Sequence, residues 1–198
     1  MKYTTYILFF LFIAASILFL KSALKPEEFP VQITGSVKCG ICHELKVQGN
    51  QQKQWIESKH AAAYKSLITE KAKAFTQQKG LESPEKNELC LKCHSSKGFL
   101  KIEFNDPAYD ISEGVGCESC HGAGSKYSPA EIMNEHELYV KNGGFENYEE
   151  ICYRCHVRKI ENKNTEFNGN LCPFQEKDFD YKSSLEKIKH PLNKESKQ

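Results

Sequence analysis

The sequence has almost no excess of charge of either sign, and outside its N-terminus it is poor in apolar residues. Its 198 residues carry 27 Lys and Arg against 26 Asp and Glu, which gives a formal net charge of +1. Proteins that bind nucleic acid usually carry a basic excess, so nucleic acid is not expected as a partner. The sparse apolar content excludes a large aliphatic core, and something other than aliphatic side chains must supply the interior.

Long hydrophobic runs are also scarce, and the chain has a single one, at its start. The run is Tyr6–Leu20, flanked by lysine on both sides. It is typical of an export signal or, slightly extended, of a membrane anchor. No clean small-x-small cleavage site and no lipoprotein cysteine accompany it, which favours an uncleaved anchor. Residues 1–24 are therefore predicted as signal or anchor and 25–35 as a linker. Everything after them is expected outside the cytoplasm.

Cysteine, by contrast, is abundant, and eight of the nine Cys belong to one motif that occurs four times. Random placement of these residues predicts roughly 0.01 C-x-x-C-H motifs per chain. The motif is typical of c-type haem attachment, in which two thiols bind the haem vinyl groups and the histidine binds the iron. Residues 36–198 are thus predicted to carry four covalently bound haem c groups. In chain order, the motifs are Cys39, Cys42 and His43; Cys90, Cys93 and His94; Cys117, Cys120 and His121; Cys152, Cys155 and His156.

Two other uses of these cysteines were weighed. Pairs of C-x-x-C motifs can hold structural zinc, but zinc would not require a histidine directly after every second cysteine. Eight cysteines in an exported chain can also form four disulfides, although C-x-x-C pairs are more typical of reactive redox sites. Haem attachment accounts for both the spacing and the histidines.

The pattern outside the motifs predicts a mainly α, small multihaem cytochrome with the haems as its core and little or no β structure. Apolar residues at helical spacing predict a long helix over about 51–78. Ser128 and Pro129 predict a helix start that leads to a stop at Gly143, and Asn147 predicts another helix start before the fourth motif. One short extended segment is predicted over 99–104.

Histidine is the residue that runs short. Four haems with two axial histidines each need eight, and the chain has seven. The motifs use four, which leaves His60, His136 and His190 as candidate distal iron ligands. One haem then lacks a histidine in its sixth position. That position could stay open or be filled by Met133, by Cys172, by a histidine of a neighbouring subunit, or by water.

Two segments give the chain a family resemblance. They are the glycine-rich third motif, Gly114–Gly124, and the stretch Trp55-x-x-Ser58-x-His60-Ala61. With the four motifs, they resemble the cytochrome c-554 family of tetrahaem cytochromes, over about 36–191. The resemblance implies a mainly helical fold with haems stacked in close pairs. It also implies periplasmic electron transfer, in the namesake from hydroxylamine oxidation towards the quinone-linked chain.

The resemblance further implies three bis-histidine haems and one five-coordinate haem, the second in sequence. In this chain that haem would be the one of Cys90, Cys93 and His94. The N-terminal apolar run and Cys172 are not part of the family pattern.

Three functions remain open at this stage. The first is a membrane-attached periplasmic carrier that passes electrons between redox proteins. The second is an enzyme that reduces a small nitrogen oxide or a peroxide at an open haem. No motif has lysine in place of its histidine, which argues against ammonia-forming nitrite reduction. The third is a subunit of a cytochrome filament, in which a neighbour supplies the eighth histidine.

Overall fold

A computed structural model describes residues 30–102, 109–156 and 179–190. Apart from Pro30, these residues belong to one compact unit, Val31–Gln198. The predicted N-terminal signal or anchor and Cys172 lie outside the described residues. The described helices are all too short or too polar to cross a membrane.

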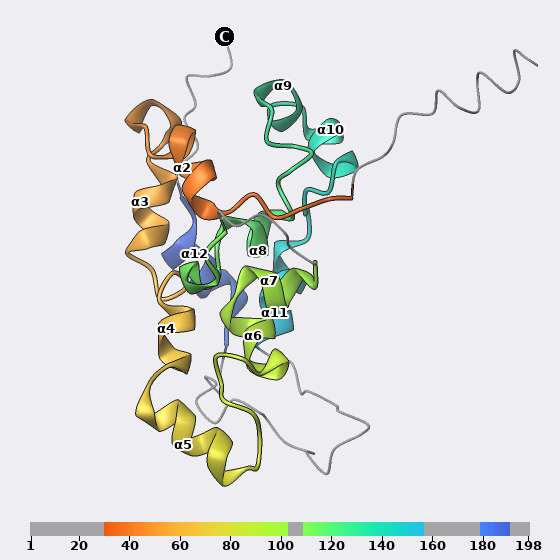
Figure 1. Ribbon diagram of the computed structural model, residues 1–198. Coiled ribbons are helices and arrows are strands. Elements are labelled where there is room, and N and C mark those ends of the chain that lie inside the picture. The colour runs from red at the N-terminus through yellow and green to blue at the C-terminus, as the bar shows by residue number, and fades with distance from the viewer. Residues whose placement is uncertain (1–29, 103–108, 157–178, 191–198) are drawn as a thin grey trace, which may run out of the picture. The chain divides into compact units, whose positions relative to one another are not determined.

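The described residues form short helices and no strand, so the prediction of a mainly α fold is confirmed (Figure 1). Short helices are expected where the interior is to be filled by prosthetic groups, because each helix needs to present only a turn or two. The α-helices are α2 (Ser36–His43), α3 (Gln51–Ile56), α4 (Ala63–Leu67), α5 (Glu70–Gln78), α6 (Glu88–His94), α7 (Ser96–Leu100), α8 (Cys117–His121), α9 (Ala130–Met133), α10 (His136–Lys141), α11 (Tyr148–His156) and α12 (Tyr181–Ile188). Two 3₁₀ turns, η1 (Lys46–Gln48) and η2 (Ile111–Glu113), complete the set.

The predicted single helix over 51–78 is wrong. The structure divides it into α3, α4 and α5, with turns before Ala63 and before Glu70. At the first break, the His60 carbonyl oxygen accepts the N–H of Val115 at 3.0 Å. It also accepts the N–H of Ala63 at 3.1 Å, which is an i to i+3 turn bond rather than an α-helical bond. A tertiary hydrogen bond therefore overrides the helical periodicity.

Two further boundaries differ from the prediction. The helix expected from Pro129 onward is interrupted at Asn134, which separates α9 from α10. The extended segment over 99–104 is wrong where it is described, because Phe99 and Leu100 end α7. The cap at Asn147 is confirmed: its side-chain oxygen accepts the Glu150 N–H at 3.1 Å.

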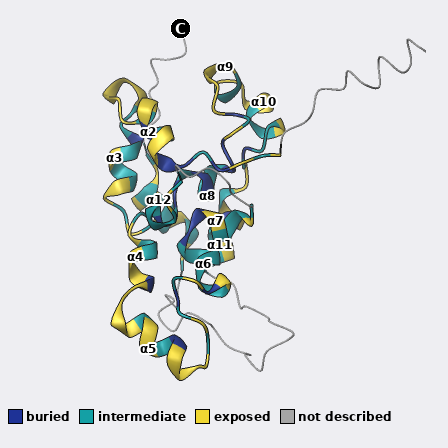
Figure 2. Cartoon of the chain, viewed as in Figure 1, coloured by how far each residue is buried: buried dark blue, intermediate teal, exposed yellow. Residues whose placement is uncertain are grey.

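Few apolar side chains are fully buried among the described residues. They are Ile33, Leu67, Ala123, Tyr127 and Ile151. Figure 2 shows the buried residues concentrated around α8 and neighbouring segments, whereas α5 is largely exposed. So small a core agrees with the expectation that haem, rather than aliphatic side chains, fills the interior.

Candidate haem sites

Each C-x-x-C-H motif forms the end of a helix. α2, α6, α8 and α11 all end at the histidine of their motif. In a helix, the two cysteines are three residues apart and the histidine is four residues after the first cysteine, so all three side chains lie on one side. This local geometry lets one haem meet both thiols and the imidazole, and no distant part of the chain is needed for it.

The imidazole of the second motif is oriented by α4. His94 Nδ1 lies 2.8 Å from the Ala63 carbonyl oxygen and 3.0 Å from Ser66 Oγ. A carbonyl can only accept, so Nδ1 carries the proton and Nε2 keeps its lone pair for a metal. The first motif is similar, with His43 Nδ1 3.3 Å from the Gln51 side-chain oxygen. Such partners fix the ring orientation of metal-binding histidines.

Two of the three spare histidines lie opposite motif histidines. The ring centroids of His60 and His156 are 6.1 Å apart, and those of His121 and His190 are 5.7 Å apart. With metal–nitrogen bonds of about 2 Å, two imidazoles that bind one metal from opposite sides have centroids roughly 6.3 Å apart. Both separations are close to that value, so the residues fit a bis-histidine haem iron.

The protonation of these rings also suits metal binding. Burial, and secondly His156, lowers the pKa of His60. Burial, followed by His190 and His43, lowers the pKa of His121 to about 4. One buried ring nitrogen of His190, Nδ1, has no hydrogen-bond partner among the described residues. Neutral imidazoles with an unused buried nitrogen are the form in which histidine binds a metal.

The third spare histidine is placed differently. His136 begins α10, its side chain is 74% exposed, and its Nε2 lies 3.4 Å from Glu146 Oε1. None of the described motif histidines lies against it. Its role as a distal ligand therefore stays a prediction, as does the identity of the group opposite His43 and His94.

The motifs adjoin one another in pairs. The thiol of Cys117 hydrogen-bonds that of Cys39 and, together with burial, raises the pKa of Cys39. The thiol of Cys93 and burial act in the same way on Cys155. The first and third attachment sites are thus neighbours, and so are the second and fourth. This agrees with the close haem pairs that the family resemblance implies.

A cavity lies where three of the motifs meet. Its lining includes His60, His156 and cysteines of the second, third and fourth motifs, Cys93, Cys120 and Cys155. Burial raises the pKa of the Cys120 thiol to about 12, with a smaller contribution from Cys152. The third and fourth sites therefore both contribute cysteines to the lining of this cavity. None of the eight described cysteines is in a disulfide, and within the described ranges no group of three His, Cys, Asp or Glu is placed to hold a metal ion alone.

A buried carboxylate holds the third motif in place, and nothing in the sequence pattern identified it. Glu118, the residue after Cys117, is 1% exposed. Its Oε1 accepts the backbone N–H of Thr34 at 2.7 Å and of Gly124 at 2.5 Å, and its Oε2 accepts that of Gly35 at 2.7 Å. This side chain joins the segment before α2 to Gly124, the C-terminal end of the glycine-rich segment.

A second network of polar side chains, formed by Ser36, Ser96 and Glu113, connects the segments around the first three motifs. Ser96 Oγ accepts the Gly116 N–H at 2.8 Å and lies 3.4 Å from Glu113 Oε1, while Glu113 Oε2 accepts the Ser36 N–H at 2.8 Å. Ser36 Oγ in turn accepts the Cys117 N–H at 3.1 Å. Burial is the main cause that raises the pKa of Glu113. The buried serines escaped the sequence analysis because serine is usually a surface residue.

Comparison with known proteins bears on these sites. The family model described as "Cytochrome c554 and c-prime" matches residues 38–122. The cytochrome c-554 of Nitrosomonas europaea is 28% identical over 141 residues, which are 62% of this chain and 57% of that protein. The chain thus matches little more than half the length of this curated relative. The solved reduced state of cytochrome c554 from Nitrosomonas europaea is 26% identical, with a TM-score of 0.48, and the match covers 71% of this chain and 72% of that one.

The resemblance to the cytochrome c-554 family is confirmed by these matches. The matched family and the curated relative are described as cytochromes c554, which agrees with the C-x-x-C-H motifs of this chain.

Proposed function

We propose that this relative of the cytochrome c-554 family is a tetrahaem electron carrier of the periplasm that passes electrons between redox proteins. The observation that carries the proposal is the pairing of His60 with His156 and of His190 with His121, at 6.1 Å and 5.7 Å between ring centroids. If both histidines of such a pair bound one haem iron, they would leave it no open position for a substrate. Two of the sites are therefore suited to carrying electrons only.

The chain's own residues bind the haems, orient their ligands and exclude water. Haem c supplies a one-electron iron couple. The eight cysteines attach it, and hydrogen bonds such as that from His94 Nδ1 to the Ala63 carbonyl set the basicity of the ligands. The proposed series of attachment sites is first, third, fourth and second: Cys39 lies beside Cys117, Cys155 lies beside Cys93, and Cys120 lines one cavity with Cys152 and Cys155. A continuous series of neighbouring sites is what a carrier between two partners requires.

Haem content and redox stoichiometry test the proposal. The purified holoprotein should have the mass of the chain plus four haems, and a redox titration should need four one-electron couples. A single couple, or a mass with fewer haems, would overturn it. Cell fractionation of the full chain tests the location: the periplasm or the membrane is expected, and a haem-free cytoplasmic protein would contradict it.

The histidine count favours a second candidate function. The second site has the oriented ligand His94, and no described histidine lies opposite it. An open iron there would bind NO or another small nitrogen oxide, or a peroxide. Electron paramagnetic resonance separates the two functions: a high-spin ferric signal that changes with NO supports the enzyme, and four low-spin signals exclude it.

A further inference from the structure

The charge of the chain is balanced as a whole but segregated along it. Residues 46–79, which contain α3, α4 and α5, have seven lysines and only two glutamates, Glu57 and Glu70. Residues 131–150, which contain α9 and α10, have six glutamates and one lysine. The seven lysines are Lys46, Lys53, Lys59, Lys65, Lys71, Lys73 and Lys79.

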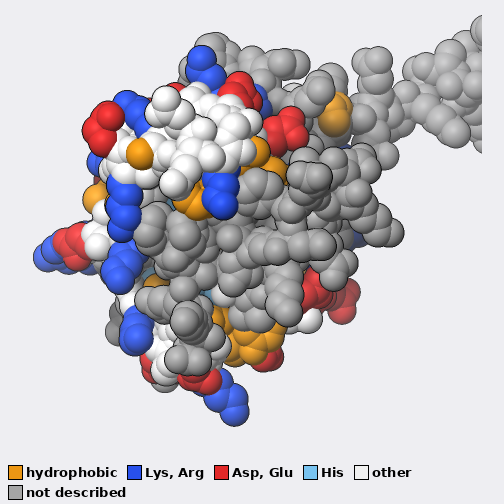
Figure 3. Space-filling view, turned by 90° about the horizontal axis from the view of Figure 1, so that it is seen from below, with side chains coloured by type: hydrophobic (Ala, Val, Ile, Leu, Met, Phe, Trp, Pro, Cys, Tyr) orange, Lys and Arg blue, Asp and Glu red, His pale blue; other side chains and the backbone are white. Residues whose placement is uncertain are grey.

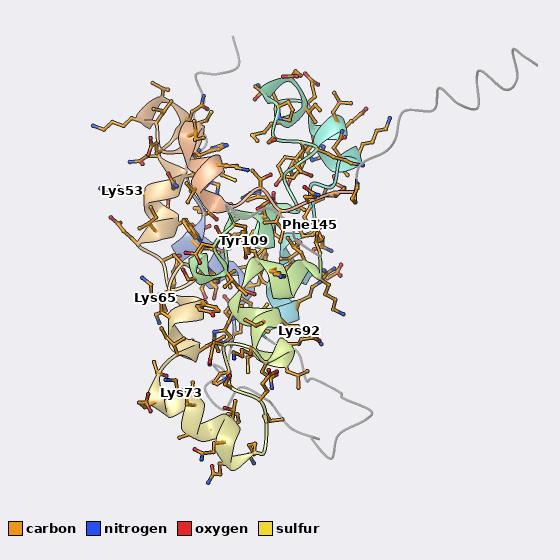
Figure 4. The ribbon with its side chains drawn as sticks, viewed as in Figure 1. Lys53, Lys65, Lys73, Lys92, Tyr109 and Phe145 are labelled. Carbon is orange, nitrogen blue, oxygen red and sulfur yellow. The ribbon has the colours of Figure 1, made fainter. Side chains whose placement is uncertain are left out.

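The lysines of α3, α4 and α5, and Lys59 in the turn between α3 and α4, are exposed. Figure 4 shows Lys53, Lys65 and Lys73 at successive heights along the outer side of the three helices. Lysine and arginine side chains also project along the left margin of the view in Figure 3. We call the exposed surface of α3–α5 that carries Lys53, Lys59 and Lys65 the basic flank.

A short repeat explains why the basic flank also has exposed apolar side chains. Lys53-x-Trp55-Ile56 in α3 corresponds to Lys65-x-Leu67-Ile68 in and after α4. In each copy the third residue is the inner anchor. The Trp55 indole N–H donates to the Val115 carbonyl at 2.9 Å, and Leu67 is 5% exposed.

The helix turn then directs the lysine and the isoleucine of each copy outward. Ile56 is 60% exposed and Ile68 is 50% exposed. Ile56 and Ile68 thus give this surface two exposed apolar side chains with lysines around them, an arrangement compatible with the apolar centre and polar rim of a protein interface.

The basic flank lies directly over two of the haem sites. The turn between α3 and α4 supplies His60, whose ring lies 6.1 Å from that of His156. α4 supplies the Ala63 carbonyl and the Ser66 hydroxyl that orient His94. A protein that docks on this flank is separated from the second and fourth sites by little more than these side chains.

We propose that the basic flank is the docking surface for an acidic redox protein, which exchanges electrons with the second and fourth sites. The occupant follows from charge: a carboxylate-rich partner is attracted, while a second copy of this chain that docked through the same flank would bring lysine against lysine. Complementary charge of this kind raises association rates by roughly 10- to 1000-fold at low ionic strength. The proposal rests on the proposed electron-carrier function and adds the chemistry of one partner.

The test uses the holoprotein and reduced plant-type ferredoxin, an acidic one-electron donor, in stopped-flow mixing. Wild-type protein should be reduced rapidly at about 10 mM salt and much more slowly at about 500 mM, where charges are screened. The variant Lys53→Glu/Lys65→Glu should react about 10-fold more slowly at low salt and converge with the wild type at high salt.

The matched control is Lys97→Glu/Lys141→Glu, which makes the same change in net charge at exposed lysines outside the flank. It should stay within about twofold of the wild type. If the rate of reduction by ferredoxin at low salt fell equally in both double variants, or fell in neither, the docking proposal would be overturned. Titration with dithionite keeps the two proposals apart: a protein that dithionite cannot reduce refutes the carrier function, whereas normal reduction with unaffected ferredoxin rates refutes only the docking surface.

Discussion

The backbone of Gly114, next to the third motif, is packed against the backbone of His60, 54 residues earlier. A Cβ on Gly114 would lie 2.7 Å from the His60 carbonyl oxygen, and the next residue, Val115, donates its N–H to that same oxygen at 3.0 Å. The glycine-rich segment thus does more than surround its own haem site. It positions the histidine that faces His156, the ligand of the fourth motif.

Replacing Gly114 by alanine should therefore disturb a haem site in another part of the chain. Gly114 has φ 78° and ψ −136°, a conformation open almost only to glycine, and the added methyl group would press on His60. We expect lower thermal stability and a high-spin fraction in electron paramagnetic resonance. Gly80→Ala is the matched control, because Gly80 also has a positive φ but has no atom within 4 Å of an added Cβ. Gly80→Ala should lower the free energy of unfolding by only about 1–2 kcal/mol and leave the haem spin state unchanged. Equal effects of the two substitutions would contradict the proposed role of this contact.

The two candidate distal ligands, His60 and His190, can be removed one at a time. His60→Ala and His190→Ala should each convert one low-spin haem to high-spin, because each leaves an iron with five ligands. Electron paramagnetic resonance of the oxidised protein measures the change, and added imidazole should restore the low-spin signal. Lys59→Ala, an exposed neighbour of His60, is the control and should show the wild-type spectrum. An unchanged low-spin spectrum in His60→Ala would show that this residue is not a ligand.

Glu118 should be needed for folding of the third motif. In Glu118→Gln, an amide N–H₂ replaces one of the oxygens that accept from Thr34, Gly35 and Gly124. The buried amide N–H₂ then faces a backbone N–H, and neither of these two donors has an acceptor. The expected loss of unfolding free energy is about 1–3 kcal/mol, seen as a lower midpoint of denaturant or thermal unfolding. The exposed Glu131→Gln serves as control and should have the wild-type midpoint. Wild-type stability of Glu118→Gln would mean that the carboxylate charge is dispensable.

Glu113 should make stability depend on pH. Burial raises the pKa of its carboxyl above the ordinary 4.5, and Glu118 adds to the effect. The folded state then holds this proton more tightly than the unfolded state, so the contribution is fully stabilising below pH 4.5 and is lost as pH rises through the raised pKa. The difference in melting temperature between wild type and Glu113→Gln should shift in favour of the variant as pH rises from about 4 to 8. Parallel melting curves across this range would refute the raised pKa.

Much of the chemistry could be predicted before the structure was known, because a C-x-x-C-H motif is a local arrangement. Spacings of three and four residues bring two thiols and an imidazole to one side of any helix, and the structure ends a helix at His43, His94, His121 and His156. The same locality explains the correct cap at Asn147. The positions of His60 and His190 were also predictable as spare histidines in a chain where histidine is scarce.

The pairing of sites could not be predicted in this way. Nothing in the spacing indicates that His60 faces His156, that His190 faces His121, or that Glu118 binds three backbone N–H groups from two segments. These contacts join residues 6 to 96 positions apart, and they depend on how the short helices pack. The break between α3 and α4 has the same origin, since the Val115 N–H donates to the His60 carbonyl. No glycine or proline between the two helices indicates this break in the sequence.

The sequence by itself predicts where haem would attach, that the fold is helical, and that the chain has one histidine fewer than four bis-histidine haems would need, because each depends on residue type and local spacing. Only the tertiary structure shows which motif histidine lies beside His60 and which beside His190, which motifs are neighbours, and which lysines are exposed. Those features depend on long-range packing of short helices, in which a single hydrogen bond from Val115 to His60 can outweigh a helical pattern.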